Sequence, residues 1–182
     1  MAHNHRVPVV SRFFHETKGN AIMYPQNEKD LVSVLQAERD ITRLINSYPY
    51  LLDSGKFSEV AGLLRHATLE VPGHQITGRN EIERFLSSGI QLHQDGTPRT
   101  WHAVSNILVE GNPFSGEASA TSYFTVHQEL PGFPLQPICT GHYKDRFALI
   151  GDEWQFVHRA VVPHLIGDIR FHVSGANAEA NL

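Results

Sequence analysis

Residues 100–109 read TWHAVSNILV, and this stretch predicts the first long strand of an antiparallel sheet. Successive side chains of a strand point to opposite faces. The alternation places His102, Val104, Asn106 and Leu108 on one face of the strand. Both faces are largely apolar, so we expect His102 to be at least partly buried. Asn106 is expected to have a structural role, satisfying backbone groups near a bend of the strand.

The rest of the second half continues this sheet. Further strands are predicted at about 116–128, 138–149 and 153–163, because Gly, Pro and Asp residues punctuate the chain between them. Residues 130–137 contain three prolines and predict an extended loop at the rim of the sheet.

The first half has a helical pattern. From Glu28 to Leu52, apolar residues recur at steps of three and four, which is typical of a long helix with one buried face. Pro49 falls inside this helix and predicts a kink or a break. Gly55 suits the left-handed position that follows a helix end.

Shorter elements are predicted along the chain between the long helix and the first long strand. A short second helix starts at Phe57, and residues 68–71 predict a short strand that stops at Pro72. A third helix is predicted at about 80–92, with Asn80 as its N-cap. Helices followed by an antiparallel meander indicate a single α+β domain, in which helices and a curved sheet enclose an apolar pocket. We expect an arm at 1–28, the domain at 29–174 and a disordered tail at 175–182.

Composition excludes several classes of function. A net charge of −4 and a pI of about 6.3 argue against nucleic-acid binding. The chain has no run of 18 apolar residues, so we expect no membrane span. Cys139 is the only cysteine, which fits a cytoplasmic location. The twelve histidines form no metal-binding motif, so neither a metal nor a cofactor is expected.

A buried His102 would need a partner for its ring N–H, and the end of the long helix offers Asp53. In an Asp–His pair the carboxylate fixes the tautomer and stabilises the imidazolium, so the other ring nitrogen can accept a proton. An unperturbed imidazole pKa of about 6.5 suits general-base catalysis at neutral pH. The residue types alone leave two alternatives open: a structural buried pair, or no contact at all.

Seven motifs in this order and spacing resemble the SnoaL-like family of the nuclear-transport-factor-2-like superfamily. The resemblance runs from about residue 37 to residue 172. The motifs are Asp40-Ile41-Thr42-Arg43-Leu44-Ile45-x-x-Tyr48, Leu52-Asp53-Ser54-Gly55, Gly78-Arg79-x-x-Ile82, His102-x-x-Ser105-Asn106, Gly141-x-Tyr143-x-Asp145, Trp154-x-Phe156-x-x-Arg159 and Gly167-Asp168-Ile169-x-x-His172.

The resemblance implies a cone, in which three helices close one end of a strongly bent sheet (a cystatin-like roll). Dehydratase and dehydrochlorinase relatives use an Asp on the first helix and a His on the first long strand. Asp53 and His102 match those positions. The resemblance also implies a hydrogen bond from Tyr48 to a substrate oxygen and a pocket role for Arg159.

Four further residues are expected to contact substrate. His127 matches a second pocket histidine of scytalone dehydratase, and Val104 shares a strand face with His102. Trp154 and Phe156 are interpreted as core and pocket wall. Arg159 has a structural alternative, an ion pair with Asp145 or Asp168.

The expected function is that of a cofactor-independent lyase or isomerase acting on a small, apolar, cyclic substrate. Elimination of water or halide ranks first and double-bond migration second. Two alternatives are a non-catalytic ligand-binding protein and a structural partner like the β subunits of ring-hydroxylating dioxygenases, which share the stretch around His102. A homo-oligomer, either dimer or trimer, is also expected.

Overall fold

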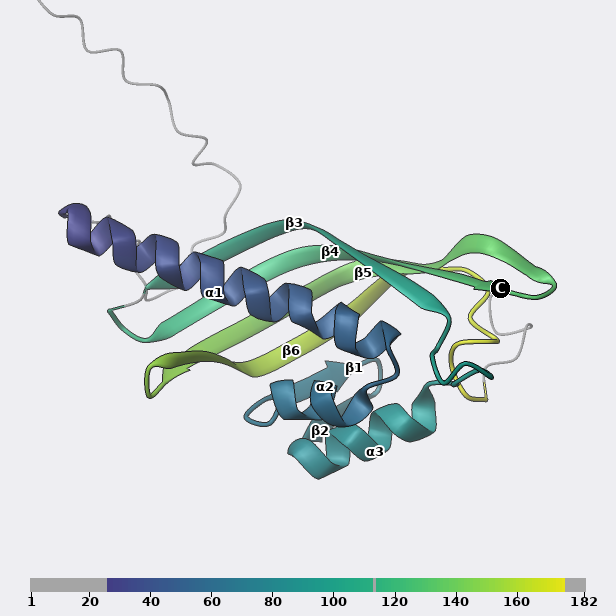
Figure 1. Cartoon of the computed structure of the whole chain (residues 1–182). Coiled ribbons are helices and arrows are strands. Elements are labelled where there is room, and N and C mark those ends of the chain that lie inside the picture. The colour runs from purple at the N-terminus through teal and green to yellow at the C-terminus, as the bar shows by residue number, and fades with distance from the viewer. Residues whose placement is uncertain (1–25, 113, 176–182) are drawn as a thin grey trace, which may run out of the picture.

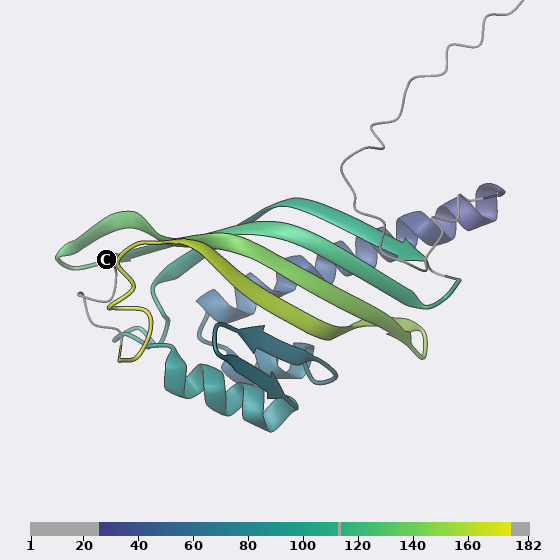
Figure 2. The same cartoon turned by 180° about the vertical axis from the view of Figure 1, so that it is seen from behind.

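The computed structural model describes residues 26–112 and 114–175, so most of the predicted arm and tail lies outside the described residues. Three helices cover one face of a curved, open, six-stranded sheet with strand order β2-β1-β6-β5-β4-β3 (Figures 1 and 2). The predicted α+β class is confirmed. The elements are α1 (Glu28–Asp53), α2 (Phe57–Leu63), β1 (Thr68–Val71), β2 (His74–Thr77), α3 (Arg79–Gly89), β3 (Thr100–Asn112), β4 (Glu117–Leu130), β5 (Phe133–Ile150) and β6 (Glu153–Ile166).

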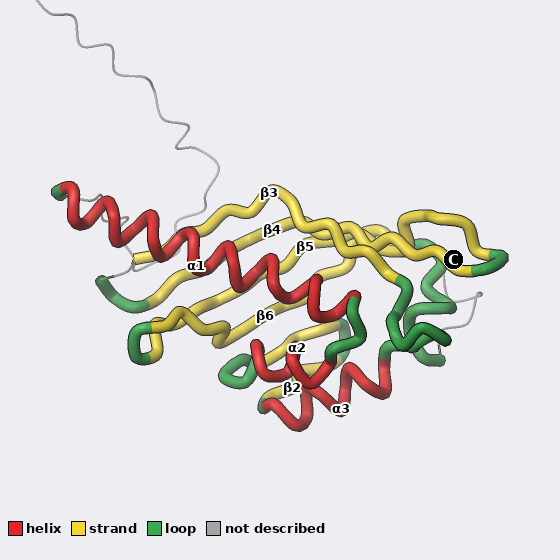
Figure 3. Tube along the Cα trace, in the orientation of Figure 1, coloured by secondary structure: helices red, strands yellow, loops and turns green. Residues whose placement is uncertain are grey.

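Helix α1 crosses the inner face of the sheet and packs against β3 and β6 (Figure 3). The Asn27 side chain caps it by accepting the backbone N–H of Asp30. Of the predicted kink or break at Pro49, the break is wrong, since a single helix runs through that residue. Pro49 and its neighbours Tyr48 and Leu52 are all buried, and this packing holds the last turn in place despite the missing backbone hydrogen bond.

Gly55 has the expected left-handed backbone, with φ of +70°. A Cβ atom there would lie 2.5 Å from the carbonyl oxygen of Gly96. The chain after α1 therefore passes against the loop that leads into β3, and only glycine fits this close approach.

A small hairpin extends the sheet beyond β6. β1 is present as predicted, but β2 was not predicted. β1 also pairs in parallel with β6, with Thr68 opposite His158. Helix α3 begins at Arg79 with Gly78 as its N-cap, so the prediction of Asn80 as N-cap is wrong.

A bulge in β3 changes which side chains face inward. The register with β4 shifts between Ser105 and Leu108, and Asn106 has φ of +51°. Asn106 therefore lies at a bend of the strand, as expected. The predicted position of Leu108 on the His102 face is wrong: the extra residue turns Leu108 outward, where it is 55% exposed. Ile107 packs against the core instead.

The predicted loop at 130–137 is also wrong. β4 and β5 form a hairpin in which Leu130 pairs with Phe133 across a two-residue turn. Gly132 makes the tight turn possible with φ of +79°. Phe133 is buried and packs edge-on against Phe171, at 5.2 Å between ring centroids.

The core lies between the helices and the concave face of the sheet. It includes Ile41 and Ile45 of α1 and Phe124 and Val126 of β4, all of them buried. None of the helices in the described part of the chain combines the length and apolarity needed to cross a bilayer.

Candidate active site

Asp53 and His102 are in direct contact where the last residue of α1 meets β3. Asp53 Oδ1 lies 2.5 Å from His102 Nδ1 and accepts the Thr100 hydroxyl at 2.7 Å. Asp53 Oδ2 accepts the backbone N–H of His102 at 2.8 Å. An ionised carboxylate only accepts hydrogen bonds, so Nδ1 of His102 carries the proton and Nε2 is left free to exchange one.

Both side chains are shielded from solvent, His102 at 5% exposure and Asp53 at 18%. Burial raises the pKa of Asp53, but the hydrogen bonds and charge of His102 and the Thr100 hydroxyl outweigh burial. The resulting pKa of Asp53 lies below its ordinary value. The carboxylate therefore stays ionised at neutral pH and can stabilise a protonated His102.

Tyr48 and Arg159 belong to a second group of side chains, which we call the arginine cluster: Arg159, Asp145, Tyr48 and Tyr143. Arg159 donates to both oxygens of Asp145, at 2.9 and 2.8 Å, and neither side chain is exposed. The guanidinium carbon lies over two aromatic rings, 4.3 Å from the centroid of Tyr48 and 4.2 Å from that of Tyr143. Arg159 therefore makes one of the structural ion pairs considered from the sequence.

One atom of the arginine cluster is unsatisfied. Nη1 of Arg159 is buried and has no hydrogen-bond partner among the described residues. Burial raises the pKa of Tyr48, and it raises that of Tyr143 further, so both hydroxyls stay protonated at neutral pH. The two tyrosines and Arg159 therefore all keep their protons at neutral pH and remain hydrogen-bond donors.

The predicted substrate contacts lie in different places. Val104 is half-buried on the inner face, two residues from His102. Trp154 and Phe156 are buried in β6, and Phe156 packs against Arg159 at 4.7 Å from its centroid.

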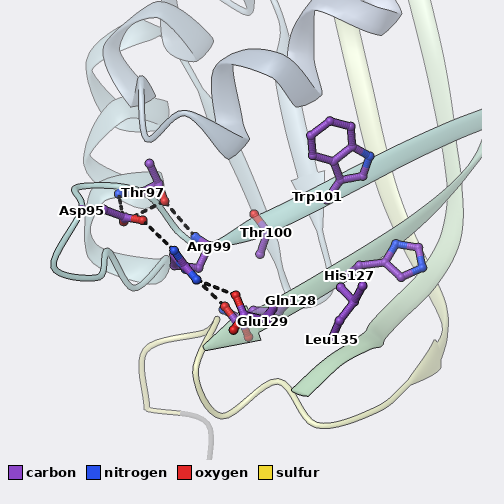
Figure 4. Close-up of a pocket in the computed structure, with 9 residues that line it drawn as sticks. All are labelled: Asp95, Thr97, Arg99, Thr100, Trp101, His127, Gln128, Glu129 and Leu135. Atoms are coloured by element: carbon purple, nitrogen blue, oxygen red, sulfur yellow. Dashed lines mark hydrogen bonds and ion pairs between the residues drawn. The ribbon is translucent and has the colours of Figure 1, made fainter. Parts of the chain in front are cut away.

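His127 does not join His102 on the inner face, which contradicts its prediction as a second pocket histidine. His102 pairs with Val126, which is buried, so the alternation of β4 turns the next residue outward. His127 instead lies opposite Trp101, which is 69% exposed. Both residues, together with Leu135, line a shallow pocket of about 330 Å³. Figure 4 shows its lining residues, with His127 next to Leu135.

One residue of the site was missed by the sequence reasoning. Residues 167–174, which we call the closing segment, follow β6 and bring His172 to His102, with their rings 6.3 Å apart and at 63°. Burial and the charge of His102 lower the pKa of His172 to about 4. The motif ending at His172 was visible in the sequence, but no periodic pattern reveals where an irregular segment folds back.

Side chains from two elements hold the closing segment in place. Gln91, just after α3, donates through its side chain to the carbonyls of Arg170 and Val173, at 2.8 and 3.0 Å. Gln128 of β4 donates to the carbonyl of Phe171 at 3.1 Å. The segment therefore has a defined position over the end of the site.

Within the described ranges, no group of three or more His, Cys, Asp or Glu side chains is arranged to hold a metal ion. The chemistry available at Asp53 and His102 is proton transfer in an apolar surrounding.

The fold is similar to that of a nuclear-transport-factor-2-like protein of Novosphingobium aromaticivorans with a cystatin-like fold, at a TM-score of 0.59 and 19% identity, covering 74% of this chain and 88% of that one. The model of the SnoaL-like domain matches residues 33–160, and the chain belongs to that family. The predicted family is confirmed. A search of curated proteins gave no match.

Several solved structures share the fold. A Mycobacterium tuberculosis protein of unknown function has a TM-score of 0.63 at 16% identity, covering 75% of this chain and 76% of that one. A protein of Novosphingobium aromaticivorans, proposed to be a scytalone dehydratase, has a TM-score of 0.61 at 21% identity, covering 76% and 91%. The β subunit of a proposed aromatic-ring-hydroxylating dioxygenase of the same organism has a TM-score of 0.61 at 15% identity, covering 76% and 97%.

Proposed function

We propose that the protein is a cofactor-independent lyase or isomerase in which Asp53 and His102 act as a general-base pair. The single observation that carries this proposal is the 2.5 Å contact between the carboxylate and an imidazole that is only 5% exposed. We assign the protein a small, apolar, cyclic substrate: the cyclic class follows from the resemblance to scytalone dehydratase relatives, and Val104 and the buried Val126 give the imidazole apolar neighbours on the inner face.

In the elimination reaction, Nε2 of His102 takes a proton from a carbon next to a carbonyl. The electron pair of that C–H bond becomes a new carbon–carbon double bond, and a hydroxyl or halide on the neighbouring carbon leaves with its bonding electrons. A leaving hydroxyl takes a proton from the imidazolium and departs as water. Asp53 stabilises the imidazolium between the two transfers. In the isomerisation, His102 returns the same proton to a different carbon.

The arginine cluster supports negative charge in this mechanism. Nη1 of Arg159 has no hydrogen-bond partner in the described part of the chain, so we assign it as a donor to a substrate oxygen on which charge develops. The ring of Tyr48 lies 4.3 Å from the guanidinium, and its hydroxyl would donate a second hydrogen bond to the substrate. The lyase reaction also agrees with the activity proposed for a scytalone dehydratase-like protein of similar fold.

The test measures proton abstraction and elimination separately. Exchange of the α-protons of 2-tetralone in deuterium oxide, followed by proton NMR, reports abstraction. Loss of water from a panel of cyclic β-hydroxyketones, followed by ultraviolet absorbance, reports elimination. General-base catalysis is worth about 10²–10⁴-fold, so Asp53→Asn and His102→Gln should each lower the rates by that order.

His127→Gln is the matched control, because it makes the same substitution on the outer face. It should leave both rates unchanged. Full rates in both Asp53→Asn and His102→Gln, with the native fold retained, would overturn the general-base proposal.

A structural partner role is the second candidate, and the fold similarity to a dioxygenase β subunit favours it. It predicts co-purification with a larger, iron-containing chain and no turnover of the panel. A ligand-binding protein would retain 2-tetralone without exchange.

The lyase proposal also includes a cytoplasmic location and assembly as a homodimer or homotrimer. Sedimentation velocity would measure the oligomeric state.

A further inference from the structure

His172 carries a buried ring nitrogen that no other described residue satisfies. Its Nδ1 is inaccessible to solvent and has no hydrogen-bond partner among the described residues. Buried polar atoms are nearly always paired, so each exception needs a reason. The ring that carries this nitrogen lies 6.3 Å from the ring of His102, so a molecule bound at the Asp53–His102 pair would explain the missing partner.

The position of the His172 ring is set by its backbone. The amide of His172 donates to the carbonyl of Ile169 at 2.9 Å, and its own carbonyl accepts the amide of Gln91 at 2.9 Å. The next residue, Val173, forms a bridge with Ile90. His172 is therefore held from two sides and placed edge-on to His102.

The charge state of His172 suits hydrogen bonding and not proton abstraction. Burial, together with the charge of His102, keeps the ring neutral at pH 7. A neutral imidazole has one N–H and one lone pair. It can donate to a carbonyl or accept from a hydroxyl without competing with His102 for the substrate proton.

We propose that His172 is a substrate-contacting residue whose Nδ1 binds a hydroxyl or carbonyl oxygen of the substrate beside His102. This inference rests on the proposed function, since it places the oxygen next to the carbon from which His102 takes a proton. It narrows the substrate class to cyclic molecules that carry an oxygen at or next to the reacting carbon. The closing segment is then part of the binding site.

Two probes separate the oxygen contact from the apolar contact. 2-Naphthol resembles the enol that 2-tetralone forms when it loses an α-proton, and naphthalene has the same ring system without oxygen. The affinities of both are measured by fluorescence titration on the full chain and on His172→Phe, which keeps a ring but removes both nitrogens. A net hydrogen bond of about 0.5–1.5 kcal/mol corresponds to roughly 2–12-fold in affinity. His172→Phe should weaken 2-naphthol by that factor and leave naphthalene unchanged.

Two further variants sharpen the result. His172→Gln restores a polar group and should recover part of the 2-naphthol affinity. His127→Phe makes the same change as His172→Phe on the outer face and should affect neither probe. The thermal midpoint of each variant, measured by circular dichroism, shows whether it remains folded.

The outcomes distinguish this inference from the proposed function. Three outcomes would overturn the role of His172. His172→Phe could lower the affinity for both probes equally, or it could lower the affinity for neither, or the native chain could bind neither probe. If His102→Gln abolishes 2-tetralone exchange and His172→Phe leaves the 2-naphthol affinity unchanged, the general-base proposal stands and the role of His172 falls. If His172→Phe weakens only 2-naphthol while exchange persists in His102→Gln, the binding role stands and the general-base proposal falls.

Discussion

Asp53 holds His102 at two points, at the ring nitrogen Nδ1 and at the backbone amide. Asp53 is the last residue of α1 and both donors belong to β3, so these hydrogen bonds also connect the long helix to the sheet. A substitution of Asp53 therefore affects the free energy of unfolding as well as the proposed chemistry, and the two effects need separate measurements.

Asp53→Asn should destabilise the fold at neutral pH by about 1–3 kcal/mol, because it weakens hydrogen bonds to a buried charged group. The pKa of Asp53 is lowered in the folded state, so its ionisation stabilises the fold above the unfolded pKa of about 3.9. That stabilisation is lost as the pH falls through the folded pKa. Urea unfolding should show a large difference between native and variant chains at pH 7 and a smaller one near pH 3. An equal difference at both values would contradict this assignment.

Asp145→Asn should lower the free energy of unfolding by about 3–5 kcal/mol, because it leaves the fully buried Arg159 without its counter-charge. The double variant Asp145→Leu with Arg159→Met removes both charges and should recover much of the loss. Glu59→Gln breaks an exposed pair with Lys56 and should change the same quantity by less than about 1 kcal/mol. Urea unfolding of all three variants measures these free energies. A loss at Asp145→Asn as small as that at Glu59→Gln would contradict the prediction.

Gly141→Ala should be strongly destabilising, because the backbone of β6 passes directly over this glycine. A Cβ atom would lie 2.2 Å from the carbonyl oxygen of Val162 and 2.8 Å from Cζ of Phe124. Overpacking of this kind costs about 1–3 kcal/mol or more. The matched control is Gly62→Ala in α2, where no atom lies within 4 Å of the new Cβ, and it should stabilise by about 0.5–1 kcal/mol. Thermal unfolding measures the stability of both variants. Similar changes of stability in Gly141→Ala and Gly62→Ala would disprove the prediction.

The closing segment should loosen as the pH falls from about 6.5 to about 4. His172 faces His102 of β3, Asp53 of α1 and His93 of the loop after α3. Burial and the two histidines outweigh the carboxylate and lower the pKa of His172 to about 4. A released His172 takes up a proton near its ordinary pKa of about 6.5, so falling pH favours release across that interval.

Hydrogen exchange at the Gln91 amide, which donates to the carbonyl of His172, measures this loosening. Because exchange chemistry itself depends on pH, protection factors are compared, and they should fall with pH in the native chain. In His172→Phe they should stay constant. Parallel behaviour of the two chains would show that another group controls the segment.

Much of the fold follows from regular patterns in the sequence. The long helix, the long strands and the glycine after α1 are each set by local periodicity or by a backbone conformation that few residues adopt. The contact between Asp53 and His102 joins two such elements, so the two residues could be proposed as partners before their geometry was known. Their catalytic role remains a prediction.

The remaining features depend on a bulge, on strand pairing and on an irregular segment, which the periodicity of the sequence does not encode. One extra residue at Asn106 reverses the alternation of β3, so Leu108 lies outside although the pattern places it inside. The assignment of His127 came from matching distances along the chain to a relative, whereas the pairing of β4 with β3 decides its face. His172 lies in an irregular segment whose position is set by the side chains of Gln91 and Gln128.

The parallel pairing of β1 with β6 has a consequence for the order in which the chain folds. Glu70 and His158, which contact each other across this pair, are 88 residues apart in sequence. Closing so large a loop is entropically unfavourable until the antiparallel meander has assembled its last strand. We therefore expect the unit containing α2, β1, β2 and α3 to dock late, as a slow kinetic phase that follows assembly of the four long strands.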